Sequence, residues 1–197
     1  MTQKRIFVLN GHPAAESLTG SVANAYAQAA RKSGHDVRVT NLHDLQFDPD
    51  YGVGGYVNVK PLEPDLEQLL SDIEWAEHFV VATPMWWGGL PAKLKGVFDR
   101  SFLPGRTFDT RNTTKLGFPA PLLTGRTGRV LLLSDTPGWF FRMFYRNALV
   151  VQIQQQILEF VGIKPVKVSK FAGASHPKVG AVDKWIKKAA KIGAQAA

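Results

Sequence analysis

The sequence contains no cysteine, so the chain can form neither a disulfide bond nor a metal site built from thiolates. It also lacks a long apolar run. Ile6 to Leu9 is too short for the core of a signal peptide, and no run approaches the length that spans a bilayer. We therefore expect a cytoplasmic protein without an integral membrane segment. Its 197 residues predict a single domain, residues 1–197, large enough to bury a core without metals.

Positive charge is in excess, with a formal net charge of +8. A nucleic-acid-binding surface usually gathers its cations on one element or interleaves them with stacking aromatics, whereas Lys and Arg here occur along the whole chain. The densest group has helical spacing and is typical of a solvent-exposed helix face: Lys184, Lys187, Lys188 and Lys191. We expect no nucleic-acid partner. A basic surface also favours anionic small molecules such as phosphorylated cofactors.

Short apolar segments alternate with amphipathic helical segments along the chain. Strands are predicted at Lys4–Asn10, Asp36–Thr40, His78–Thr83, Arg129–Ser134 and Lys164–Phe171, with helices at about 18–33, 64–76, 91–100, 147–161 and 179–193. This alternation predicts an α/β fold with a doubly wound parallel sheet of flavodoxin-like type and strand order 2-1-3-4-5. In that order, the segments after the first, third and fourth strands meet at one edge, where α/β proteins bind ligands.

The segment after the first strand has the features of a phosphate cradle. Ser17 is a good N-cap for the following helix, whose first N–H groups attract anions. The hydroxyls of Ser17 and Thr19, with the neighbouring His12, would complete the cradle. The alternative is that Ser17 only caps the helix and that His12 only bonds the local backbone.

The segment after the third strand combines two tryptophans with two glycines. Pro84 cannot continue a central strand, so we expect a turn over Pro84–Gly89 and place Pro91 at the first helical position. Glycines at such a turn let the backbone approach a ligand. Trp86 and Trp87 either contact that ligand or fill core space.

Three other segments lack a clear period. Asp48–Tyr56 is loop by composition. Leu103–Gly125, rich in Pro, Gly and Thr, is predicted to be a lid or partner contact, with disorder as the alternative. Trp139–Tyr145 is unusually aromatic and follows Asp135–Gly138 at the end of the fourth strand. We interpret it as part of a pocket and partner surface, the alternative being core.

Three motifs together resemble the flavodoxin-like NAD(P)H:quinone oxidoreductase family. This family includes the DT-diaphorase type, the modulator-of-drug-activity type and the ancillary flavoproteins of potassium efflux. The resemblance covers nearly the whole chain. Its carriers are Gly11-His12-Pro13 with Ser17–Gly20, Pro84–Gly88 running into Pro91–Gly96 and Phe98-Asp99-Arg100, and Ile157–Gly162.

The resemblance implies a flavin, with FMN favoured because no long C-terminal extension follows, and FAD as the alternative if Asp48–Tyr56 holds an adenine. It implies that NADPH or NADH reduces the flavin and that a quinone then takes the same place, a two-electron ping-pong reaction. The implied cofactor-binding residues are His12, Ser17, Leu18, Thr19, Gly20, Pro84, Met85, Trp86, Trp87, Gly88, Asp135, Thr136, Pro137 and Gly138. Trp87, Phe108 and Tyr145 are the candidates for the substrate slot, and a homodimer is expected.

Two departures from the family pattern bear on the chemistry. Asp135-Thr136-Pro137-Gly138 stands where many relatives have Thr-Thr-Gly-Gly, which should weaken stabilisation of a reduced flavin anion. The Tyr and His proposed as a proton relay in the mammalian enzymes have no clear match, since no His follows the fourth strand until His176. Nitroaromatic and azo compounds are therefore alternative acceptors. A flavin-bound regulatory subunit of a membrane transporter and a flavodoxin-type electron carrier are the other functional readings.

Overall fold

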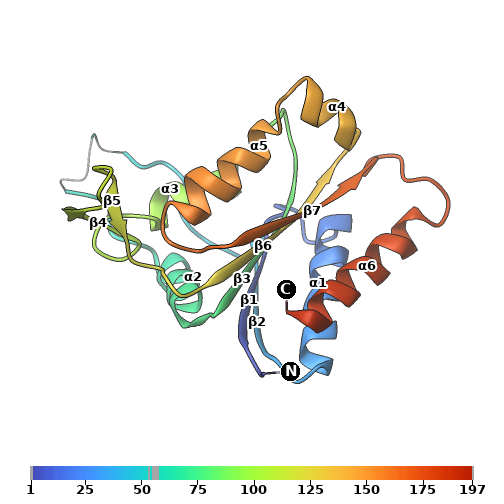
Figure 1. The fold of residues 1–197 in the computed structure, drawn as a ribbon, viewed down its shortest axis with the longest axis horizontal. Helices are drawn as coiled ribbons and strands as arrows, with labels where there is room; N and C mark the ends of the chain where they lie inside the picture. Colours follow the sequence, from blue (N-terminus) through green and yellow to red (C-terminus); the bar gives the residue numbers. More distant parts are fainter. Residues whose placement is uncertain (1, 53, 55–57, 197) are drawn as a thin grey trace.

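The computed structural model describes residues 2–52, 54 and 58–196 of the chain. A parallel five-stranded sheet, with order β2-β1-β3-β6-β7, runs through its centre (Figure 1). Its strands are β1 (Arg5–Asn10), β2 (Asp36–Asn41), β3 (His78–Pro84), β6 (Thr127–Ser134) and β7 (Val166–Ala172). Because β6 and β7 are the fourth and fifth predicted strands, the predicted α/β fold and strand order are confirmed.

Helices cover both faces of the sheet (Figure 1). They are α1 (Leu18–Lys32), α2 (Pro64–Trp75), α3 (Ala92–Ser101), α4 (Gly138–Met143), α5 (Ala148–Val151) and α6 (Ala181–Gln195). Alternate residues of β1 serve the two cores: Ile6 and Val8 pack toward α1 and α6, whereas Phe7 and Leu9 pack toward α2 and α3. A strand buried on both faces reads as a continuous apolar run, which is why its position could be predicted.

The prediction of a long structureless segment at Leu103–Gly125 is wrong. This segment contains two antiparallel strands, β4 (Phe108–Thr113) and β5 (Pro119–Pro121), which project from the side of the molecule (Figure 1). The side chains of Phe108 and Leu123 are buried in the larger core and anchor the ends of this hairpin. Apart from Phe108, β4 is polar, so its sequence shows neither strand alternation nor an apolar run.

Two predicted boundaries also differ from the structure. Pro84 is the last residue of β3 and not the first of the turn. The N–H of Met85 donates to the carbonyl of Leu133 in β6, so the nitrogen of Pro84 faces β1, beyond the last paired residue of that strand. A proline costs no ladder hydrogen bond there. Pro91 precedes helix α3 as its N-cap, and the helix begins at Ala92.

The helix predicted over Asn147–Val161 has two parts. A single α-helical turn, α5, continues into a π-helix, η1 (Gln152–Glu159). The apolar residues at helical spacing predict Leu149, Ile153, Ile157 and Phe160 on the inward face. Leu149 and Ile153 are buried, whereas Phe160 is 37 % exposed and Leu158 is buried instead, so the predicted stripe holds only over the first half of the helix. The wider π-helical turn is not encoded in a 3.6-residue period, and such turns often occur at functional sites.

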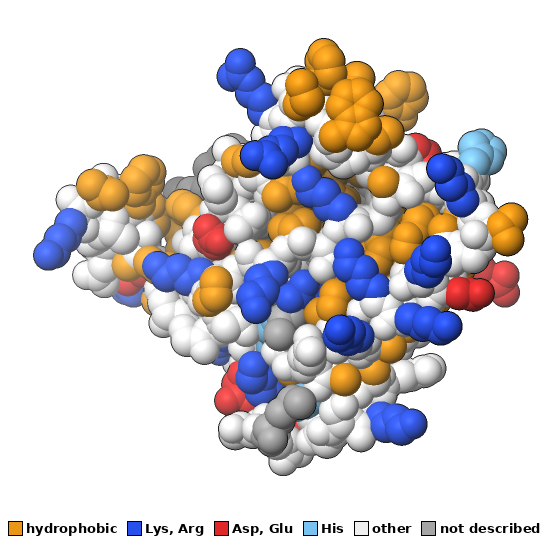
Figure 2. All heavy atoms as spheres, turned by 45° about the vertical axis from the view of Figure 1, so that its right-hand side comes forward, with side chains coloured by type: hydrophobic (Ala, Val, Ile, Leu, Met, Phe, Trp, Pro, Cys, Tyr) orange, Lys and Arg blue, Asp and Glu red, His pale blue; other side chains and the backbone are white. Residues whose placement is uncertain are grey.

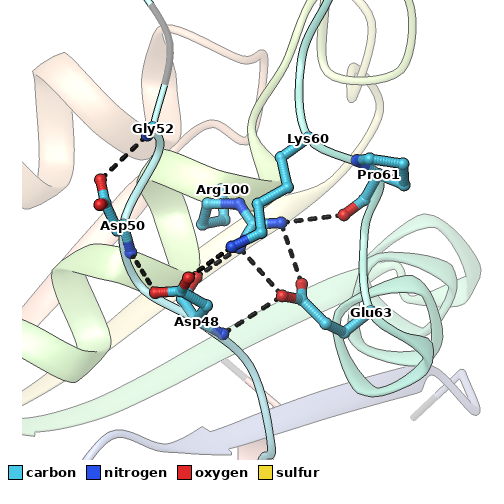
Figure 3. Close-up of polar contacts among 7 residues, drawn as sticks. All are labelled: Asp48, Asp50, Gly52, Lys60, Pro61, Glu63 and Arg100. Carbon is cyan, nitrogen blue, oxygen red and sulfur yellow. Dashed lines mark hydrogen bonds and ion pairs between the residues drawn. The ribbon is translucent and has the colours of Figure 1, made fainter.

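In the segment between β2 and α2, the described residues 42–52, 54 and 58–63 form no helix or strand, but Arg100 of α3 bonds to both sides of this segment (Figure 3). Arg100 is fully buried. Its Nη1 donates to the carbonyl of Asp48 and to Glu63 Oε1 at 3.1 Å, and its Nη2 donates to Pro61 O at 2.9 Å and Glu63 Oε2 at 3.0 Å. Lys60 pairs with the Asp48 carboxylate. The predicted loop over Asp48–Tyr56 lies partly outside the described residues.

His78, the first residue of β3, makes stability depend on pH. Burial, reinforced by the positive charges of Lys4 and Arg129, lowers the pKa of His78 to about 3 from its ordinary 6.5. Below pH 6.5 the His78 ring is protonated in the unfolded chain but stays neutral in the folded chain. The free energy of unfolding therefore falls as the pH falls from 6.5 toward 3. We expect the free energy of unfolding to fall by about 2 kcal/mol between pH 8 and pH 5 from this group alone.

Denaturant unfolding of wild type and His78→Gln across this pH range measures that contribution. Glutamine cannot titrate, so the variant is expected to lose about 2 kcal/mol less than the wild type over the same interval. Parallel pH profiles for the two proteins would contradict this assignment.

Candidate functional site at the carboxyl rim of the sheet

The segments after β1, β3 and β6 begin side by side at one rim of the sheet. Asn10 pairs with Ala82, and Pro84 pairs with Leu133. Beyond these pairs, the Gly11 N–H donates to Ala82 O at 2.7 Å and the Met85 N–H donates to Leu133 O at 2.8 Å. The structure therefore brings together the three segments that carry all the predicted cofactor-binding residues.

The first of these segments leads into helix α1 as predicted. Ser17 is the N-cap, and its Oγ accepts the N–H of Gly20 at 3.0 Å. A Cβ at Gly20 would lie 3.1 Å from Asn10 Nδ2 and 3.2 Å from Ser17 Oγ, so glycine lets the first helical turn sit close to the end of β1. Leu18 and Thr19 supply the next backbone N–H groups of this turn, beside the loop that carries His12. The arrangement suits an anion at the helix N-terminus.

His12 contributes a donor and not a positive charge. Its Nδ1 accepts the N–H of Ala14 at 3.0 Å, as in the local-backbone alternative. Burial lowers the pKa of His12 below its ordinary value, and more strongly than this hydrogen bond raises it, so the ring is neutral at pH 7. Since Nδ1 accepts, the proton of the neutral ring is on Nε2, which can donate one hydrogen bond. The ring meets Trp86 edge to face, with 5.6 Å between centroids.

The second segment forms a tight turn with a strained tryptophan. Trp86 and Gly89 exchange two backbone hydrogen bonds of 3.0 and 2.9 Å, so Trp87 and Gly88 are the central residues. Their φ angles are +51° and +76°. Both residues therefore lie in the left-handed region, which glycine adopts readily and bulky residues adopt only rarely. Such strain costs on the order of 1–3 kcal/mol and concentrates at functional sites.

The indole of Trp87 is fully exposed and that of Trp86 is 45 % exposed. The alternative in which both tryptophans fill core space is therefore wrong. A strained backbone that holds a large apolar side chain in solvent does nothing for packing. The turn thus leaves the Trp87 indole outside the packed core.

In the third segment, the Asp135 carboxylate is hydrogen-bonded to the loop after β7. Its two carboxylate oxygens accept the N–H of Ser175 at 2.6 Å and the Ser175 hydroxyl at 2.7 Å. These bonds, with the nearby charge of His176, hold the pKa of Asp135 below its usual range. The carboxylate is thus ionised and already bonded at one side of the rim. Thr136 follows it, Pro137 is the N-cap of α4, and Gly138 is its first residue.

One open cavity adjoins the turn, and a second open cavity shares its lining at the π-helix. One of about 520 Å³ is bordered by Trp87, Gly88 and Arg146. The other, of about 800 Å³, lies between α3, β4 and η1. Gln152 and Gln156 line both. These two glutamines were missed by sequence reasoning, because the prediction for this helix rested on its apolar stripe alone.

The three slot candidates are not gathered in one place within a single chain. Trp87 borders the smaller cavity and Phe108 the larger one, where its buried ring meets Phe160 edge to face at 5.4 Å. Tyr145 follows α4 and is 54 % exposed, with its ring against Phe140 and Phe141. Within the described residues, no group of three or more His, Asp or Glu side chains could hold a metal ion. None of the helices described there is long and apolar enough to cross a bilayer.

Comparison with known proteins gives consistent matches. The model of a family described as having a flavodoxin-like fold matches residues 4–192. An uncharacterized NAD(P)H oxidoreductase, YcaK, of Escherichia coli is 30 % identical over 112 residues, which are 55 % of this chain and 57 % of that protein. An FMN-dependent NADH:quinone oxidoreductase of Beijerinckia indica is 30 % identical over 129 residues, 64 % of this chain and 61 % of the relative. The chain thus spans less than two thirds of either relative.

Among solved structures, an NAD(P)H:quinone oxidoreductase from Methanothermobacter marburgensis superposes with a TM-score of 0.82. It is 20 % identical, and the match covers 98 % of each chain. At this identity the likeness establishes the fold alone.

Proposed function

This chain belongs to the family with a flavodoxin-like fold, and from that premise we propose that it is an FMN-dependent NAD(P)H oxidoreductase that reduces quinones. The observation that carries the proposal is the strained Trp86–Gly89 turn, which lies at the same rim as the Ser17-capped helix. The chemical class comes from the two similar proteins, an NAD(P)H oxidoreductase and an FMN-dependent NADH:quinone oxidoreductase.

The residues at the rim fit FMN. In this proposal, Ser17, Thr19 and the Nε2–H of His12 would bind its phosphate, with the first N–H groups of α1. The backbone of Met85–Gly88 and the segment Asp135–Gly138 would bind the ring edge, as the resemblance implies. A bound FMN would supply hydride transfer, taking a hydride (two electrons and one proton) from the nicotinamide and giving it to the quinone, with one proton from solvent completing the hydroquinone.

The other parts of the proposed mechanism, which are the stacking slot and the hydrogen bonds to the acceptor, come from side chains of the protein. Trp87 forms one apolar wall of a stacking slot and excludes water from that side. Gln152 and Gln156 offer amide donors at the cavity beside the turn, where a quinone oxygen needs a hydrogen bond. We also propose that a second copy of the chain supplies the opposite wall, because a fully exposed Trp87 closes only one side.

Steady-state oxidation of NADH or NADPH by the FMN-loaded protein tests this function, with a soluble benzoquinone as acceptor. We expect acceptor-dependent turnover with parallel double-reciprocal lines, the signature of a ping-pong reaction. The variant Trp87→Gly, which relieves the strained φ, is expected to lose at least tenfold in kcat/KM while its free energy of unfolding stays equal or rises by about 1 kcal/mol. Full activity of Trp87→Gly, or an inert FMN-loaded wild type, would refute the proposal.

A further inference from the structure

The net positive charge of the chain is confined to its last third. Residues 1–135 carry fourteen Lys and Arg and fourteen Asp and Glu, so this part is neutral. Residues 136–197 carry ten Lys and Arg against only two carboxylates, Glu159 and Asp183. Such asymmetry is a mark of segments that meet anionic surfaces.

The same part of the chain exposes an aromatic patch on and just after α4, which we define as Trp139, Phe140, Met143, Phe144 and Tyr145. The exposed fractions of Trp139, Met143, Phe144 and Tyr145 are 63 %, 70 %, 62 % and 54 %. Phe140 holds the patch together: its ring stacks on that of Phe144 at 4.4 Å and meets Trp139 and Tyr145 at 5.6 and 5.5 Å. The exposed apolar area is on the order of 500 Å², a size that marks interaction surfaces.

Cations border this patch. Arg142 and Arg146 are exposed within the same segment. From β7, the Lys170 ammonium lies 5.2 Å from the Phe141 ring and donates to Asn147 Oδ1 at 2.6 Å. The adjacent carboxylate, that of Asp135, accepts two hydrogen bonds from Ser175. Figure 2 shows the hydrophobic side chains gathered at the top of the molecule, over α4, with Lys and Arg across the face below.

We propose that the aromatic patch docks this protein onto the surface of a bilayer that contains anionic lipids. Trp, Phe, Tyr and Met side chains enter the boundary between headgroups and acyl chains, while Arg142, Arg146 and Lys170 meet lipid phosphates. Arg146, which borders the patch, also lines the cavity beside Trp87, so the docked surface would lie next to the proposed slot.

Other occupants match these features less well. A symmetric contact centred on this patch, with Arg142 and Arg146 at the two-fold axis, would bring these cations close to those of the copy, and like charges repel. A nucleic acid would satisfy the cations, but it offers no apolar phase for Met143 and Phe144. Self-association and binding to nucleic acid are therefore two of the outcomes that the test distinguishes.

Sedimentation with phosphatidylglycerol and phosphatidylcholine vesicles, using the FMN-incubated full chain, tests the docking. We expect binding to mixed anionic vesicles and at least tenfold weaker binding to vesicles of phosphatidylcholine alone. Arg142→Gln with Arg146→Gln is expected to weaken binding roughly twenty-fivefold, at about fivefold for each basic residue. Trp139→Ser with Phe144→Ser should weaken it at least tenfold, since each ring loses its place in the boundary.

The tip of the β4–β5 hairpin offers a matched control. It also exposes a cation and two apolar side chains, Lys115, Leu116 and Phe118. Lys115→Gln with Phe118→Ser is expected to leave vesicle binding unchanged. Circular dichroism of every variant confirms that it is folded.

Three results would overturn the proposal. The first is wild-type protein that stays in the supernatant at low salt. The second is binding that the hairpin variant abolishes and the α4 variants keep. The third is a patch that instead drives concentration-dependent self-association or binding to duplex DNA without vesicles. Vesicle binding needs no turnover, so NAD(P)H oxidation measured on the same samples separates a failure of docking from a failure of the proposed activity.

Discussion

Replacement of Arg100 by methionine is expected to lower the free energy of unfolding by about 3–5 kcal/mol, because it leaves a partly buried carboxylate without its partner. Arg100 is fully buried and makes hydrogen bonds to Glu63, to Asp48 O and to Pro61 O. Methionine fills much of the space but donates nothing. Urea unfolding at pH 7, followed by circular dichroism, measures the loss.

Two further variants sharpen this prediction. Arg100→Lys keeps the charge but not the planar fork that bonds both oxygens of Glu63, so its stability should fall between those of wild type and Arg100→Met. Lys95→Met removes a half-exposed ammonium of the same helix, whose partner Asp99 is also half exposed, and should leave the unfolding transition nearly unchanged. Equal midpoints for Arg100→Met and Lys95→Met would show that the segment between β2 and α2 is not fixed through Arg100.

Replacement of Ser17 by aspartate is expected to weaken FMN binding about a hundredfold while leaving the fold intact. Aspartate is as good an N-cap as serine, so helix α1 keeps the cap that Ser17 gives it through the N–H of Gly20. The carboxylate, however, stands where the proposed phosphate binds. Repulsion between two negative charges about 4 Å apart costs roughly 1–4 kcal/mol, which matches the expected loss. Fluorescence titration of the apoprotein with FMN measures it.

Ser17→Ala and riboflavin are the matched controls for that variant. Ser17→Ala loses the cap and should lower the free energy of unfolding by about 1 kcal/mol, with a smaller loss of FMN affinity than Ser17→Asp. Riboflavin carries no phosphate, so Ser17→Asp should bind it as well as wild type does. Equal weakening for FMN and riboflavin would place the phosphate elsewhere.

The parts of the fold that could be predicted from the sequence are those whose residues carry a local signal. Ile6 to Leu9 and His78 to Ala82 are buried on both faces, so their apolar runs identify β1 and β3. Ser17 marks the start of α1 because capping is a contact between neighbours in sequence. Once the strands were placed, the strand order brought the three rim segments together.

What could not be predicted depends on distant contacts or on geometry without a sequence signal. The contacts of Arg100 have no signal in the sequence, since Glu63 lies far from it along the chain. Phe108 is predicted to line the substrate slot, but its side chain is buried in the core, where it anchors β4. The left-handed φ of Trp87 contradicts its residue type, and such conflicts between local preference and structure are expected at functional sites.

The central claim is that the three segments at the carboxyl rim together bind FMN by its phosphate and its ring edge. Titration of purified apoprotein with FMN, followed by the quenching of flavin fluorescence, tests it most directly. We expect the fluorescence titration to saturate at one FMN per chain, and we expect Ser17→Asp to reduce the affinity for FMN about a hundredfold. Protein that takes up neither FMN nor FAD when either is supplied in excess would contradict it.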